Sequence, residues 1–112
     1  MKKIYALLVL AGVVNAAAAA DIVGNPKAAV AKVEQCIGCH GIPGYKATFP
    51  EVYRVPMIAG QSAKYLESAL TAYKKGDRKH PTMRGIAAVL SEQDIADVSA
   101  YYAQMPSTTA RK

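Results

Sequence analysis

The sequence has 112 residues and a formal net charge of +6 at neutral pH, and 52% of its residues are apolar, 20% charged and 7% aromatic. This length allows one domain, and it excludes both a two-domain cofactor enzyme and an array of three or more ordinary repeats. The excess of basic residues comes without a nucleic-acid recognition motif, so we expect no nucleic-acid partner.

The first twenty residues have the layout of a secretory signal peptide. Lys2 and Lys3 precede an apolar stretch of eleven residues, 4–14, and small residues follow up to Ala20. Eleven apolar residues are too few to span about 30 Å of hydrocarbon, which argues against an uncleaved membrane anchor. Cleavage after Ala20 would leave residues 21–112, with a net charge of +4, as an exported periplasmic chain without a stable anchor. We expect its folded core to cover about residues 26–106.

A chain of about 90 residues has a thin apolar core, and small exported domains commonly gain stability from disulfides, a metal or a cofactor. The two cysteines, Cys36 and Cys39, are three positions apart. A disulfide between them would close too small a loop to stabilise a whole domain. The sequence therefore predicts that a bound group fills the interior.

Three helical segments are predicted after residue 24. The first opens at Asn25-Pro26, an N-cap followed by proline at the first helical position, and its apolar residues recur at Val30, Val33 and Ile37. The second covers about residues 62–75 and ends at Gly76. Its apolar face consists of Tyr65, Leu66, Ala69, Leu70 and Tyr73.

The last helix has the clearest start and end signals. Ser91 is its expected N-cap, Leu90 and Ile95 occupy the positions of a hydrophobic staple, and Pro106 ends the segment. Residues 85–89 are predicted to form one short helical turn. Residues 41–61 contain too many glycines and prolines for a regular element, and no segment alternates as a strand would. The fold class is therefore all-α, with a long irregular segment that suits the wrapping of a large ligand.

The pattern Cys36-Ile-Gly-Cys39-His40 is the most informative motif. C-x-x-C-H is the attachment sequence of c-type haem: two thiols add to the vinyl groups of one porphyrin, and the next residue supplies a proximal imidazole. A thiol–disulfide oxidoreductase also uses C-x-x-C, but it requires a βαβ context that is missing here. A zinc site could draw on both cysteines, His40 and His80, and a structural disulfide is the simplest alternative.

At this point the sequence resembles the class I cytochromes c, in particular the short bacterial periplasmic monohaem type. Besides CIGCHG, the resemblance rests on PMIAGQSAKYL, on a Lys-Lys-Gly end to the middle helix, on HPTM and on LSEQDIADVSAYYA. It covers roughly residues 27–105, and the order and spacing of these segments after the cysteines are specific. It implies three to four helices wrapped around one covalently attached haem c.

The resemblance also implies roles for individual residues. Cys36 and Cys39 would form the thioethers, and His40 would be the proximal iron ligand. Pro56 fits the family's proline whose carbonyl accepts a hydrogen bond from that histidine, and Met83 stands where the family has its distal methionine. The first and last helices would cross, with Tyr101 or Tyr102 at the contact.

Four residues are candidates for the sixth iron ligand: Met57, Met83, Met105 and His80. Met105 lies on an apolar helix face, where methionine is usually core filler. Met57 follows Pro56 on the segment that supports the proximal side, and His80 lies in a basic turn where a solvated side chain is the ordinary expectation. Met83 is favoured, and its thioether suits ferrous iron and raises the reduction potential.

The function predicted from these residues is single-electron transfer between redox protein partners, without catalysis. The basic turn, residues 74–84, is either a solvated surface or a face that docks acidic partners. The alternatives are a haem c subunit of a larger dehydrogenase or oxidase complex, and a gas-binding or catalytic haem protein with an open iron position.

Overall fold

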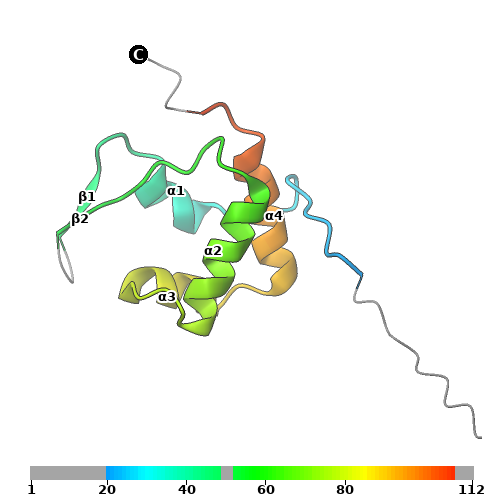
Figure 1. The fold of residues 1–112 in the computed structure, drawn as a ribbon. Helices are drawn as coiled ribbons and strands as arrows, with labels where there is room; N and C mark the ends of the chain where they lie inside the picture. The colour runs from blue at the N-terminus through cyan, green and yellow to red at the C-terminus, as the bar shows by residue number, and fades with distance from the viewer. Residues whose placement is uncertain (1–19, 49–51, 108–112) are drawn as a thin grey trace, which may run out of the picture.

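The computed structural model describes residues 20–48 and 52–107, so residues 1–19 of the predicted signal peptide lie outside the described part of the chain. The helices of this part are α1 (Glu34–His40), α2 (Ala63–Lys75), α3 (Pro81–Ala88) and α4 (Glu92–Ala103). The two-residue strands β1 (Lys46–Ala47) and β2 (Tyr53–Arg54) pair antiparallel. In Figure 1, α2 lies in the middle of the helices, and β1 and β2 lie at their edge. Apart from this short ladder the architecture is all-α.

The predicted ends of α2 and α4 are confirmed. The Ser62 hydroxyl accepts a hydrogen bond from the Tyr65 N–H at the start of α2, and Gly76 ends the helix with a φ of +88°, a conformation that favours glycine. Ser91 and Asp94 form a reciprocal capping box at the start of α4. Both helices therefore begin at a serine N-cap, and α2 ends at a glycine, as local sequence signals predict.

The first predicted helix is shorter than the sequence indicates. Residues 26–33 form consecutive turns, and the regular helix α1 begins only at Glu34. Tertiary contacts hold both ends of this segment: the Asn25 N–H donates to Asp97 in α4 at 2.8 Å, and Lys32 is paired with the same carboxylate. These bonds hold the segment against α4 in a form that local propensity did not predict. As a result Val33 is buried, whereas Val30 is 60% exposed.

The third helix is longer than predicted. It begins at Pro81 rather than at Gly85, and His80 is its N-cap. Proline at the first helical position is a favourable start because its missing N–H would have no partner there. Histidine is an uncommon N-cap, which is why the sequence did not reveal this start.

The core lies where α4 meets α2 and the turns before α1. Helix α2 packs against both α3 and α4. One cluster of buried residues joins three segments of the chain, and it consists of Ala29, Val33, Leu66, Val98 and Tyr102. The turns of residues 26–33 supply the buried residues of the predicted contact with the last helix, where Tyr102 lies, and Cys36 of α1 packs against the same cluster. Among the described residues, no helix is long and apolar enough to cross a membrane.

A buried carboxylate fastens this junction. Asp97 is 2% exposed and accepts hydrogen bonds from the Asn25 N–H, the Lys32 ammonium and the Gln93 amide, each at 2.8 Å. Lys32 also pairs with Asp94. Every donor is needed because a buried charge without partners is strongly destabilising.

Candidate cofactor site

A cavity of about 430 Å³ opens between α1, α2, α3 and the segment that follows β2. Its volume lies in the range of sites for organic ligands and cofactors. All five residues to which the sequence assigns a role line it: Cys36, Cys39, His40, Pro56 and Met83. The fold therefore gathers side chains that are up to 47 positions apart in the sequence.

His40 is oriented by a backbone group. Its Nδ1 lies 2.6 Å from the carbonyl oxygen of Pro56. A carbonyl oxygen only accepts hydrogen bonds, so Nδ1 carries the hydrogen and donates it, and the neutral ring keeps a lone pair on Nε2. Hydrogen bonds of this kind fix the tautomer and orientation of an imidazole and increase its basicity as a metal ligand.

The two thiols are partly buried and are not joined by a disulfide. Burial, reinforced by the neighbouring Cys39, raises the pKa of the Cys36 thiol. Thiol–disulfide oxidoreductases depend on the opposite shift, because the thiolate is the attacking species. This environment argues against the redox-thiol alternative.

The zinc alternative requires several ligands that converge on one point. Within residues 20–48 and 52–107, no three His, Cys, Asp or Glu side chains are grouped so that they could hold a metal ion. His80 lines the same cavity as Cys36, Cys39 and His40, but it does not complete such a group. The arrangement of donors therefore gives no support to a tetrahedral zinc site.

The four candidates for the sixth ligand are not equivalent in position. Met57, Met83 and His80 line the cavity, whereas Met105 packs against the buried core cluster. Met57 follows Pro56, whose carbonyl contacts His40, so Met57 lies on a segment already held by the histidine. Met83 comes from α3, a different element, and is partly buried.

Much of the remaining wall of the cavity is apolar, and α2 contributes five residues to it. All five residues of the predicted apolar face of this helix line the cavity, together with Ile86 and Val98 from α3 and α4. The helical spacing thus revealed residues of the site that the motif alone did not. Tyr102 also lines the cavity, and its buried hydroxyl has no hydrogen-bond partner within the described part of the chain. Burial, with smaller effects of Cys36 and Tyr101, raises the pKa of this phenol.

These donors and walls fit haem c. Two thiols three positions apart, an imidazole with a free Nε2 and a separate thioether are the groups that attach and ligate such a cofactor. A large apolar cavity would be costly to leave empty in a small domain.

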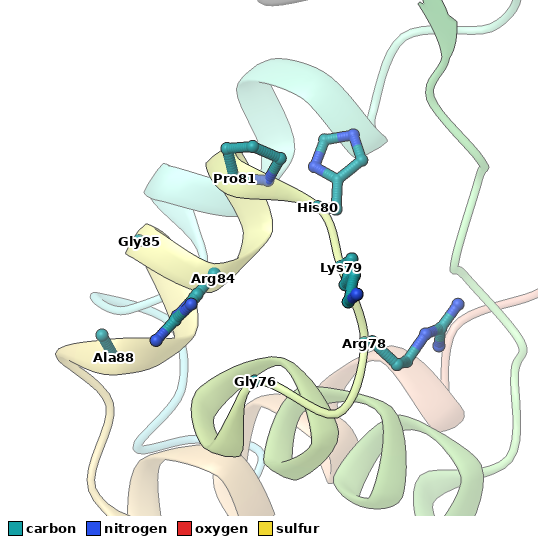
Figure 2. Close-up of a pocket in the computed structure, with 8 residues that line it drawn as sticks. All are labelled: Gly76, Arg78, Lys79, His80, Pro81, Arg84, Gly85 and Ala88. Carbon is teal, nitrogen blue, oxygen red and sulfur yellow. The ribbon is translucent and has the colours of Figure 1, made fainter.

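A second hollow of about 510 Å³ lies beside this cavity, between the end of α2 and α3, and Figure 2 shows the residues that line it. Arg78, Lys79 and Arg84 contribute positive charge, and we call these three residues the α2–α3 basic surface. All three are exposed. Arg78 and His80 line both hollows, so the basic surface continues to the edge of the cavity.

Known proteins are similar to this chain in sequence and in fold. A family model described as Cytochrome c matches residues 27–106. The chain is 42% identical over 82 residues to cytochrome c-554(548) of Halomonas halodenitrificans, and the match covers 70% of this chain and 94% of that protein. It is 36% identical over 102 residues to cytochrome c4 of Pseudomonas aeruginosa, covering 91% of this chain and 47% of that protein.

Among solved structures, that of reduced recombinant cytochrome c4 from Pseudomonas stutzeri is similar to this chain, with a TM-score of 0.53 at 29% identity. The likeness covers 75% of this chain and 52% of that one. The chain therefore spans nearly the whole of one relative and about half the length of the cytochrome c4 relatives.

Proposed function

Because this chain belongs to the cytochrome c family, we propose that it is a periplasmic carrier that passes single electrons between redox protein partners. The resemblance, the all-α class I fold and the haem c cofactor predicted from the sequence are confirmed by this membership. The observation that carries the finer proposal is the cavity that gathers Cys36, Cys39, His40 and Met83. Residues 21–112 would form the mature domain after removal of the signal peptide.

In this proposal Cys36 and Cys39 hold the haem through thioether bonds, and His40 is its proximal ligand. Bound haem supplies an iron atom that gains and loses one electron. The hydrogen bond from His40 to the Pro56 carbonyl supports the assignment, because it keeps Nε2 free and the ring fixed. The apolar face of α2 excludes water from the site.

Met83 is proposed as the distal ligand. Its position on α3 supports this role, because the segment that carries the alternative, Met57, is already tied to His40. With His40 and Met83 both as ligands, the iron would have no open coordination position. The chain is therefore proposed as a carrier and not as a catalyst or a gas sensor.

The test is an absorption spectrum of the protein exported in a host that matures c-type cytochromes. We expect covalently bound haem, a far-red methionine–iron band in the oxidised form and no shift when carbon monoxide is added to the reduced form. Met83→Leu, which nearly conserves volume, should abolish the far-red band and admit carbon monoxide, whereas the matched variant Met57→Leu should do neither. A carbon monoxide shift in the wild type would overturn the proposal of a closed iron site.

We propose the α2–α3 basic surface as the face that docks acidic redox partners. It is exposed and adjoins the cofactor cavity, and its charges form no ion pair with a carboxylate within the described part of the chain. Electrostatic attraction of this kind accelerates association and weakens with salt.

Ferricyanide, a small anionic oxidant, tests this surface directly. Lys79→Ala should slow oxidation of the reduced protein by ferricyanide and reduce the salt dependence of the rate. Lys64→Ala is the control, since the Lys64 side chain is 88% exposed and lies in α2 outside the lining of both hollows. Equal effects of the two substitutions would show that net charge, not this surface, governs the encounter.

A haem c subunit of a larger complex is the second candidate, because the chain spans about half the length of its cytochrome c4 relatives. Size-exclusion chromatography of the native protein separates the two candidates. A free carrier elutes at the mass of one chain, and a subunit elutes with its partner.

A further inference from the structure

The start of α3 is capped in an unusual way. The Nδ1 atom of His80 accepts a hydrogen bond of 3.3 Å from the backbone N–H of Met83. The His80 carbonyl in turn accepts from the Arg84 N–H at 2.9 Å. Pro81 has no N–H, so the Met83 amide is one of the few donors at this helix start that require a partner from outside the helix. One imidazole therefore supplies the hydrogen-bond acceptor for the backbone N–H of Met83, the residue proposed as the distal ligand.

The ring that makes this bond lies near two aromatic residues. Tyr53 of β2 makes an edge contact with the His80 ring at a centroid distance of 4.8 Å, and Tyr73 of α2 lies at 6.5 Å. The Arg78 guanidinium lies 4.7 Å from the centroid of the Tyr73 ring. Edge-to-face pairs of this geometry are favourable beyond their buried area. The imidazole thus links β2, α2 and α3, and Figure 2 shows it beside Pro81 at the head of α3.

We propose that His80 is a positioning residue that holds Met83 in place for iron ligation through its N-cap hydrogen bond. The inference rests on the proposed function, because it assumes that Met83 is the distal ligand. His80 acts through the backbone of Met83 and not as a ligand itself. Because Nδ1 accepts from Met83, the hydrogen of the neutral ring lies on Nε2, and neither nitrogen has a free lone pair for iron while the cap is formed.

The free energy of an N-cap sets the expected size of the effect on Met83 ligation. Loss of an N-cap costs about 1 kcal/mol, which corresponds to about a five-fold change in an equilibrium constant. Detachment of Met83 from the iron is such an equilibrium, and an added ligand that competes with Met83 measures it. The affinity of the oxidised protein for imidazole therefore reports how firmly Met83 is held.

Three variants of the mature, haem-loaded protein test the proposal. His80→Ala removes the acceptor and should raise the affinity for imidazole about five-fold, with a weaker far-red methionine–iron band. His80→Asn keeps a side-chain acceptor that suits an N-cap. Its affinity for imidazole should therefore stay within about two-fold of that of the wild type. Lys75→Ala, in the last turn of α2, removes an exposed charge outside the lining of both hollows and should leave the affinity for imidazole unchanged.

The outcomes distinguish a failure of the positioning role of His80 from a failure of the assignment of Met83 as the distal ligand. If His80→Ala leaves imidazole affinity unchanged, or if His80→Asn raises it as much as His80→Ala does, the positioning role is overturned. If the wild type itself lacks the far-red band, and Met83→Leu leaves its spectrum unaltered, the ligand assignment in the proposed function fails instead. Rescue by asparagine is decisive, because a role in general packing of the ring would not be rescued.

Discussion

Two regions of the molecule differ in how they are held together. Where residues 24–33 meet α4, backbone and charged side chains interlock: Asp97 has three hydrogen-bond donors, and Gly24 lies so close to α4 that an added Cβ would be 2.2 Å from the Ala96 carbonyl oxygen. Around the cavity, by contrast, α1 contributes no buried residue, and Tyr53 and Tyr65 are exposed. The first region is complete without a ligand, whereas the second is built around a space of about 430 Å³.

The contrast assigns different tasks to the two regions. The junction with α4 stabilises the chain, and the cavity region recruits and orients the cofactor. Helix α2 joins them, because Leu66 belongs to the buried core cluster and also lines the cavity. Substitutions at the junction should therefore change the free energy of unfolding, and loss of the cofactor should change the cavity region most.

Removal of the cofactor should have the largest effect. Cys36→Ser/Cys39→Ser, exported in the same host, should carry no covalent haem and should lose its cooperative thermal transition. Without the cofactor the apolar residues that line this cavity would face water, and the whole stability of a small domain is only about 5–15 kcal/mol. Calorimetry measures the thermal transition of the variant, and amide hydrogen exchange measures its residual structure. Any residual protection from exchange should lie in α2 and α4. A sharp transition near that of the holoprotein would contradict this prediction.

The two regions also differ in how well the sequence predicts them. The ends of α2 and α4 follow from Ser62, Gly76 and Ser91, whose effects are local, and the cysteine–histidine motif follows from covalent chemistry at fixed spacing. The turns before α1 could not be predicted, because the partner that holds Asn25 lies 72 positions away. Likewise, nothing near His80 in the sequence announces the tyrosines that hold its ring.

Loss of the buried charge at the junction should have the next largest effect. Asp97→Asn keeps the shape of the side chain but weakens its bonds to Lys32 and to the Asn25 N–H, and it should lower the free energy of unfolding by about 2–3 kcal/mol. Urea denaturation of the holoprotein measures this loss. The matched variant is Asp94→Asn, which removes a more exposed partner of Lys32 and should cost less. Equal losses in the two variants would show that burial of Asp97 contributes nothing.

A pair of glycines tests the close packing of the same junction. Gly24→Ala should lower the free energy of unfolding by about 1–3 kcal/mol, because the new methyl group would overlap the α4 backbone at Ala96. Gly85→Ala is the control: nothing lies within 4 Å of its added Cβ, and the residue is inside α3. This change should stabilise the protein by about 0.5–1 kcal/mol, since alanine favours helix. If both variants were destabilised, the close approach of Gly24 to α4 would not be what distinguishes the two glycines.

The pH dependence of stability should show the smallest effect, and it arises at the junction. The Lys32 ammonium, followed by the Asn25 amide and Gln93, holds the pKa of Asp97 below its ordinary value, and Lys32 and Ser91 do the same for Asp94. A carboxylate whose pKa is lower in the folded than in the unfolded chain adds stability that is fully present above the unfolded pKa, about 4. That contribution disappears as the pH falls from there through the folded pKa.

The free energy of unfolding should therefore be level from about pH 7 to about pH 5 with respect to these groups and should fall below about pH 4. Urea titrations of the wild type and of Asp97→Asn at each pH isolate the contribution of Asp97, because the variant lacks that titration while any effect of acid on the cofactor is common to both. The two curves should converge on acidification, since protonation removes from the wild type the charge that the variant already lacks. A gap that stays constant down to about pH 3 would mean that the Asp97 charge does not stabilise the junction, and that its donors pair as well with a neutral side chain.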